Sequence, residues 1–91
     1  MSALTREQIR GAILDTLCAI APETDPAGIA PGAPLREQID LDSMDFLNVI
    51  IRLHETLGID IPESDYARLA TLDSAVDYLA RRSGAGYAGG A

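Results

Sequence analysis

Apolar residues along this chain recur at helical spacing, and no stretch alternates in the manner of a β-strand. In the first segment Ile9, Ile13 and Leu17 lie four residues apart and share one helix face. Thr5, followed three residues later by Gln8, is the arrangement of a capping box, which starts a helix. We therefore predict a first helix that begins after this threonine and ends at the following alanine–proline pair, because proline pushes the preceding residue out of the helical region.

The rest of the chain contains one interrupted stretch and further helical ones. Residues 22–39 hold several prolines and two glycines, and they predict a long loop. Residues 43–57 predict a second helix that ends at Gly58, since glycine readily adopts a left-handed conformation. Residues 59–82 predict a short third helix and a longer fourth one. The predicted class is all-α: a four-helix bundle with three longer helices, a short third helix and a long loop between the first two.

Length, composition and charge limit the size of the domain, the class of its partners and its compartment. A chain of 91 residues fits one small domain, which we predict to span residues 1–82, with the glycine-rich residues 83–91 as a disordered tail. The net charge of -7 argues against a nucleic-acid partner, which would need a basic footprint. No segment approaches the about 20 apolar residues of a membrane span, and the first residues lack the apolar run of a signal peptide. We therefore expect a cytoplasmic monomer without membrane contact.

The second predicted helix carries two apolar faces. The first face has five members at the spacing of a core stripe: Phe46, Val49, Ile50, Leu53 and Leu57. Met44, Leu47 and Ile51 form a second stripe, about 140° around the helix at about 100° per residue. Either another part of the chain covers this second stripe, or it is a docking surface for partner proteins, since exposed apolar patches mark interaction sites. Periodicity leaves both alternatives open.

A serine between two aspartates stands at the start of the same helix. If Asp42 is the N-cap, Asp45 lies at the third helical position, where its carboxylate can reach back toward the cap and complement the positive helix end. Ser43 then has no capping duty and projects into solvent at a helix N-terminus, which favours an attached phosphate. In the alternative interpretation Ser43 is itself the cap, or a tolerated surface residue.

Residues 40–80, DLDSMDFLNVIIRLHETLGIDIPESDYARLATLDSAVDYLA, resemble the acyl carrier protein family, whose Asp-Ser-Leu motif opens the second helix. The resemblance implies a four-helix bundle that is not an enzyme. It implies that Ser43 is esterified with 4'-phosphopantetheine, donated from coenzyme A by a magnesium-dependent phosphopantetheinyl transferase, and that acyl groups ride on the arm as thioesters. Asp42, Met44 and Asp45 match the motif residues that flank the serine.

The resemblance also gives a role to the second apolar stripe. Met44, Leu47 and Ile51 match positions that contact the transferase and the acyl-handling partners in relatives. These partners are acyl-activating, acyl-transferring or ketoacyl synthase-type enzymes. Asp40 and Glu55 add negative charge, which would steer basic partner surfaces toward this face.

Two features bear on the acyl group and the pathway. Four residues match the cavity that shelters an acyl chain in some members of the family: Phe46, Ile50, Leu53 and Ile61. Asn48, Arg52 and His54 stand where fatty-acid-synthesis carriers are richer in acids, which favours a dedicated fatty-acid-like, polyketide or specialised acyl-transfer pathway. The alternatives are an aminoacyl or peptidyl carrier and an unmodified helical adaptor that binds through the second stripe.

Catalytic and metal sites find little support in the sequence. His54 follows Ser43 by eleven residues on one helix, about 16 Å away, which no hydrogen bond can span, and no G-x-S-x-G elbow is present. The acids Asp40, Asp42 and Asp45 lack the glycine and the glutamate that an EF-hand loop needs at its sixth and twelfth positions. We therefore expect neither catalytic residues nor metal ligands.

Overall fold

The computed structural model describes residues 4–89 and is all-α, as predicted. In chain order its helices are α1 (Arg6–Ile20), η1 (Pro26–Gly28), α2 (Leu35–Gln38), α3 (Ser43–Leu57), η2 (Glu63–Leu69) and α4 (Leu72–Gly89), where η marks a 3-10 helix. The described range contains no β-strand beyond one isolated bridge. None of the helices in it is both long and apolar enough to cross a membrane.

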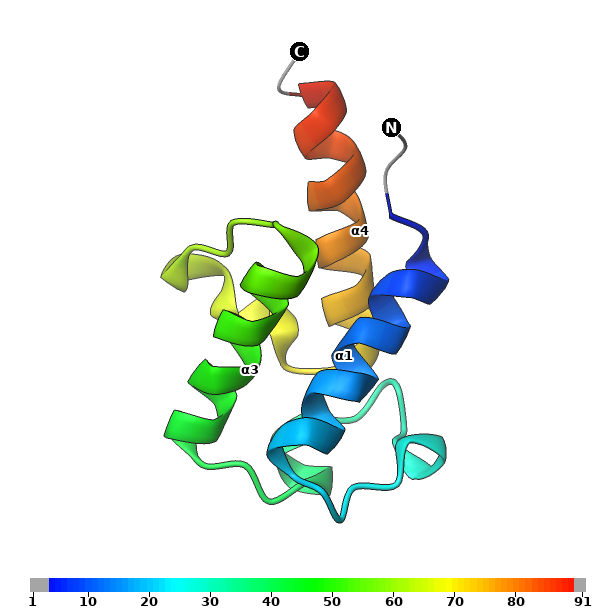
Figure 1. Cartoon of the computed structure of the whole chain (residues 1–91), viewed down its shortest axis with the longest axis vertical. Coiled ribbons are helices and arrows are strands. Elements are labelled where there is room, and N and C mark those ends of the chain that lie inside the picture. The colour runs from blue at the N-terminus through cyan, green and yellow to red at the C-terminus, as the bar shows by residue number, and fades with distance from the viewer. Residues whose placement is uncertain (1–3, 90–91) are drawn as a thin grey trace.

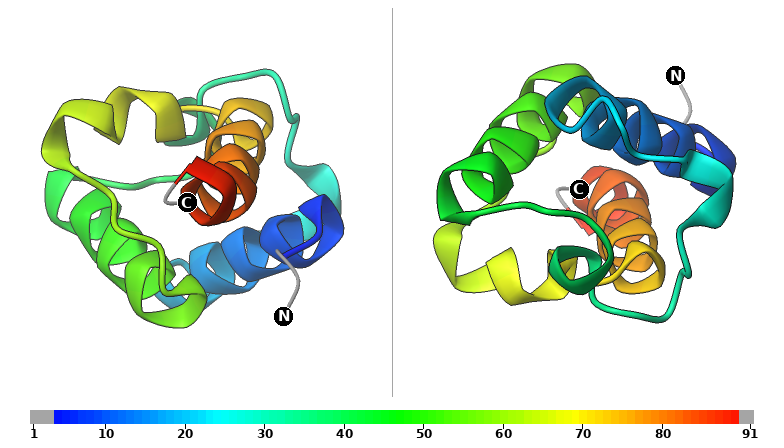
Figure 2. Two further views of the ribbon diagram at one scale, coloured as in Figure 1. Left: turned by 90° about the horizontal axis from the view of Figure 1, so that it is seen from above. Right: turned by 90° about the horizontal axis from the view of Figure 1, so that it is seen from below.

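Three long helices enclose the core. α1 runs antiparallel to α3 and α4 and packs against both of them (Figure 1). Seen along the long axis, α1, α3 and η2 are arranged around α4 (Figure 2). The largest side chains that are fully buried come from α1, α3 and α4: Ile9, Ile13, Leu17, Leu53, Leu72 and Leu79. A compact aliphatic core is what a chain of this length can build, since a small domain buries a limited share of its surface.

Both ends of α1 form as the sequence predicts. The Gln8 backbone N–H donates to Thr5 Oγ1 at 3.0 Å, and the Thr5 N–H donates to Gln8 Oε1 at 2.8 Å, which completes the capping box. At the other end Ala21, the residue before Pro22, is the C-cap, and its N–H donates to the Leu17 carbonyl. Short-range chemistry therefore decides where this helix begins and ends.

The long loop before α3 is held to the core and to itself. Ile29, Leu35 and Ile39 are buried and join the loop to the core. The Gln38 side chain accepts from the Ala30 N–H at 2.6 Å and donates to the carbonyls of Ala30 and Ala33 at 2.9 and 3.0 Å. These three bonds close residues 30–38 of the loop on themselves. The segment also forms η1, which the Asp25 side chain caps, and α2, where the sequence predicted only a loop.

The short helix η2 is clamped between α4 and the loop. The Tyr78 hydroxyl on α4 donates to the Asp65 carboxylate at 2.6 Å, and the Leu35 N–H donates to the Ala70 carbonyl at 2.7 Å. Burial, and then the hydrogen bond to Asp65, raise the pKa of Tyr78 to about 12. The tyrosine therefore stays protonated, as a donor, through the neutral range. The clamp brings the loop, η2 and the beginning of α3 together at one end of the bundle.

The last helix is longer than predicted. The sequence placed its end at Arg82, with a disordered tail over residues 83–91, whereas α4 continues to Gly89. No proline interrupts this stretch, and each glycine costs a helix only about 1 kcal/mol relative to alanine, which weakens it without a sharp stop. Arg81 and Arg82 thus lie inside the helix and not at its end. The division into a domain and a tail stays a prediction, and residues 90–91 lie outside the described residues.

Candidate functional site

Asp42 caps the helix that carries the candidate site. Its backbone is extended, and its Oδ1 accepts from the Asp45 N–H at 2.8 Å. The Asp42 carbonyl accepts from the Phe46 N–H at 2.9 Å, which is the first turn of α3. The interpretation in which the aspartate caps is confirmed, and the alternative in which Ser43 caps is wrong, because the aspartate already satisfies the amide that a capping side chain would take.

Ser43 is the first residue of α3, and it is exposed. Within residues 4–89 its hydroxyl makes no hydrogen bond, and neither its own N–H nor that of Met44 has an acceptor. Unsatisfied amides at this position are a general property of helix N-termini and leave partial positive charge beside the hydroxyl. The hydroxyl is therefore accessible from solution, on a helix end that favours an anionic group.

Asp45 differs from its expected role in one respect. In the described part of the chain its carboxylate does not accept from the Asp42 N–H, so α3 lacks the reciprocal bond that completes the box at Thr5 and Gln8. The half-buried Asp45 contributes through its negative charge in the first turn, which the helix macrodipole favours.

The two apolar faces of α3 have different environments. Val49, Ile50 and Leu53 are buried, and two further members of the core stripe are half-buried against them: Phe46 and Leu57. The second stripe faces solvent, with exposed fractions of 69% for Met44, 39% for Leu47 and 51% for Ile51. The alternative in which another segment covers this stripe is therefore wrong.

Acids surround the exposed stripe, and the one histidine lies elsewhere. Asp40, Asp42 and Glu55 are exposed, so their charge is available to a partner. His54 Nδ1 lies 2.9 Å from the Ile59 carbonyl oxygen, at the far end of α3 from Ser43. Within the described range no three His, Cys, Asp or Glu side chains are placed to hold a metal ion. Among the described residues no histidine lies beside the Ser43 hydroxyl, and the neighbouring Asp42 carboxylate is engaged as the helix cap, so the arrangement suits a site that another protein modifies.

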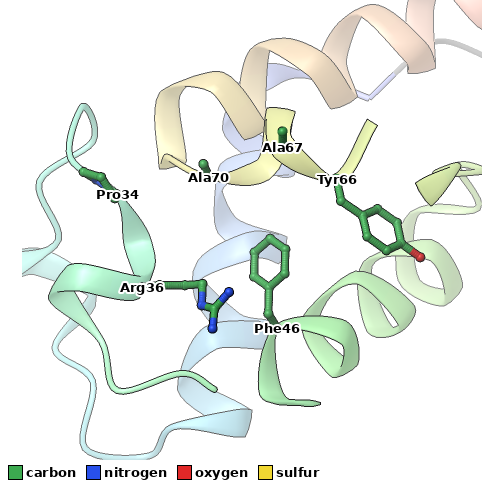
Figure 3. Close-up of a pocket in the computed structure, with 6 residues that line it drawn as sticks. All are labelled: Pro34, Arg36, Phe46, Tyr66, Ala67 and Ala70. Atoms are coloured by element: carbon green, nitrogen blue, oxygen red, sulfur yellow. The ribbon is translucent and has the colours of Figure 1, made fainter. Parts of the chain in front are cut away.

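A pocket of about 240 Å³ opens beside the first turn of α3 (Figure 3). Its lining residues come from the loop, α3 and η2: Pro34, Arg36, Phe46, Tyr66, Ala67 and Ala70. Of the four residues predicted to line an acyl cavity, only Phe46 borders it. The other three, Ile50, Leu53 and Ile61, are buried in the packed core. The sequence did not predict Arg36 and Tyr66 as lining residues, because no periodic pattern relates two residues that are 30 positions apart.

This site fits a phosphodiester-linked group. The accessible Ser43 hydroxyl supplies an attachment atom, and the helix end beside it favours negative charge, while Asp42 keeps the helix start in place without using the serine. Nothing in the described residues blocks the hydroxyl.

Comparison with known proteins agrees with this geometry. A family profile described as "Phosphopantetheine attachment site" matches residues 7–79. The acyl carrier protein of Rubrobacter xylanophilus is 34% identical over 55 residues, which cover 60% of this chain and 68% of that protein. The acyl carrier protein of Lactobacillus johnsonii is 30% identical over 84% of this chain and 94% of its own length. Acyl carrier protein 2, mitochondrial, of Arabidopsis thaliana is 29% identical over 81% of this chain and 66% of its own length.

A profile match that runs from the first helix into the fourth is not what the unmodified adaptor alternative predicts. The chain belongs to the acyl carrier protein family, whose members are non-catalytic carriers of acyl groups on a covalent 4'-phosphopantetheine prosthetic group.

Proposed function

We propose that Ser43 is the attachment point of the prosthetic group and that the second stripe of α3 receives the partner enzymes. The observation that carries the first part is the exposed, unbonded hydroxyl of Ser43 at the capped start of α3. Asp42 holds the helix start, and Met44 and Asp45 complete the flanking motif. The arm supplies a thiol that carries the acyl group as a thioester.

Loading requires chemistry that this chain does not supply alone. Ser43 Oγ forms a bond to the phosphorus that carries the pantetheine, while the bond from that phosphorus to the leaving 3',5'-ADP of coenzyme A breaks. The hydroxyl proton passes to a base on the phosphopantetheinyl transferase. The chain's only histidine is bonded to the Ile59 carbonyl at the other end of α3 and is not available for this step. The role of the carrier is therefore to present the hydroxyl.

A direct test is loading by a broad-specificity phosphopantetheinyl transferase with coenzyme A and magnesium, followed by intact mass measurement. We expect a gain of one phosphopantetheine. Trypsin then cuts after Arg36 and Arg52 and releases residues 37–52, in which Ser43 is the only residue with a hydroxyl group. The added mass must lie on this peptide; addition to any other peptide would refute the assignment.

Partner docking is proposed for the stripe of Met44, Leu47 and Ile51, with Asp40 and Glu55 as its acidic border. The exposure of these three apolar side chains next to Ser43 supports the proposal, because a soluble domain gains nothing from leaving them in water. The transferase and the acyl-activating, acyl-transferring or ketoacyl synthase-type enzymes would bury this stripe and place basic residues against the acids.

We expect Leu47→Asp to lower kcat/KM for loading by about tenfold or more, since burial of one such side chain contributes about 1.5–3 kcal/mol and a buried carboxylate opposes docking. Loading rates at limiting transferase measure this effect. Thr56→Asp is the matched control, because it adds the same charge at another exposed position of α3. If both variants load at the wild-type rate while circular dichroism shows an intact fold, the stripe is not the docking surface.

The pathway proposed is a dedicated one: fatty-acid-like, polyketide or specialised acyl transfer, in the cytoplasm. Asn48, Arg52 and His54 are all exposed on α3, so a partner enzyme would meet fewer acidic side chains on this helix. An aminoacyl or peptidyl carrier is the second candidate within the class. The activating enzyme that loads the thiol separates the two candidates. The mass of the loaded protein isolated from its native cell identifies the group that is carried.

A further inference from the structure

Arg36 is an exposed cation with no counter-ion among residues 4–89. Its Nε donates to the Leu41 carbonyl at 3.3 Å, and its guanidinium lies over the Phe46 ring, 5.8 Å from the centroid. Within the described range no carboxylate lies in salt-bridge distance of it, and its Nη1 and Nη2 make no hydrogen bond. Two contacts therefore hold this side chain in place while most of its donors remain available to a ligand.

Arg36 borders the pocket beside α3. The other five lining residues contribute an aromatic or small apolar surface, and Arg36 is the only charged one. Figure 3 shows the Arg36 side chain extending toward Phe46, whose ring points toward the side of Ala67 and Ala70. A ligand that suits this place has an anionic group followed by a compact apolar part.

The pocket lies next to Ser43. Leu41, which Arg36 contacts, precedes the serine by two residues, so their Cα atoms are at most about 7.6 Å apart. Phe46 follows the serine by three residues and lies about 60° around the helix from it, at about 100° per residue. Leu47 lies about 40° from it on the other side. A group on Ser43 therefore has the Arg36 pocket on one side and the proposed docking stripe on the other.

We propose that Arg36 binds the phosphate of the prosthetic group and that the pocket receives the branched apolar segment next to that phosphate. This inference rests on the proposed attachment at Ser43. The phosphodiester carries one negative charge, which matches the unpaired guanidinium, and the adjoining carbon with its two methyl groups matches the apolar walls. The arm would start at Ser43, two residues after the Leu41 that Arg36 contacts and three before Phe46, which lines the pocket, so its proximal part can extend toward the pocket. Arg36 is thus a positioning residue that holds the arm on the side away from the docking stripe.

The test uses the loaded protein and nuclear Overhauser contacts between the two methyl groups of the arm and the Phe46 ring. We expect these contacts in the wild type and a loss of about two- to fivefold in Arg36→Gln, the size of an exposed ion pair. Salt at about 1 M should weaken the wild-type contacts in the same direction. Arg52→Gln, which removes an exposed arginine on α3 that does not line the pocket, is the matched control and should leave them unchanged.

Each outcome separates the two proposals. Failure of the 37–52 peptide to gain mass overturns the attachment at Ser43, and this inference with it. Normal loading without methyl–Phe46 contacts overturns the inference alone, as does an equal loss in Arg36→Gln and Arg52→Gln. Arg36→Lys keeps the charge and should retain contacts that respond to salt. Wild-type contacts that do not weaken in about 1 M salt refute the ionic role.

Discussion

Replacing Ser43 with alanine is expected to abolish loading completely while the domain keeps its fold. The hydroxyl makes no hydrogen bond within residues 4–89, so its removal breaks no interaction seen in the structure, and alanine is well suited to a helix. The cap that starts α3 belongs to Asp42 and remains in place. Intact mass after incubation with transferase and coenzyme A should show no gain at any time, and thermal unfolding should be close to that of the wild type.

Ser64→Ala provides the matched control. Ser64 is likewise an exposed serine in the first turn of a helix, here the short η2, and the Ser64→Ala variant should load at the wild-type rate. Residual loading of Ser43→Ala would place the attachment at another residue. Equal impairment of both variants would point to a general effect on the fold instead of a lost attachment atom.

Leu53→Ala should produce the largest loss of stability among changes on α3. The side chain is 1% exposed and lies in the core between the long helices. Truncation of a buried leucine costs about 2–5 kcal/mol, because the transfer free energy is lost and a cavity remains. Since a small domain has about 5–15 kcal/mol in total, this variant should approach the limit of folding. Urea unfolding with an unchanged m-value measures the difference.

Ile51→Ala tests the same helix on its other face. This side chain is 51% exposed, so its truncation should change the free energy of unfolding by less than about 1 kcal/mol. The contrast with Leu53 is the point of the experiment, because the two residues are two positions apart and both are apolar. Comparable losses from the two variants would mean that the exposed stripe is buried in solution.

Local sequence chemistry predicted the helices that carry the site. The capping box at Thr5 and Gln8, the start of α3 after Asp42 and its end at Gly58 all form as expected, with Gly58 at φ 67°. These features depend on residues within one turn of each other, so a single sequence contains the needed information. The extension of α4 beyond Arg82 was missed because glycine weakens a helix without marking a definite end.

Features that join distant segments were not predictable in the same way. The loop before α3 is closed by the bonds of Gln38 and attached at Ala70, which lies 35 residues after Leu35. The Arg36 pocket likewise depends on η2 packing beside the first turn of α3. No periodicity in the chain relates residues that far apart.

The amino-acid order alone specified an all-α domain, a capped helix that begins at Ser43, and two apolar stripes on that helix. Tertiary packing decided which stripe is buried. Leu53 and its neighbours lie in the core, while Met44, Leu47 and Ile51 are exposed to solvent. The physical reason is that periodicity shows which residues share a face but not which face the other helices cover. That choice is made by the burial of apolar surface over the whole chain.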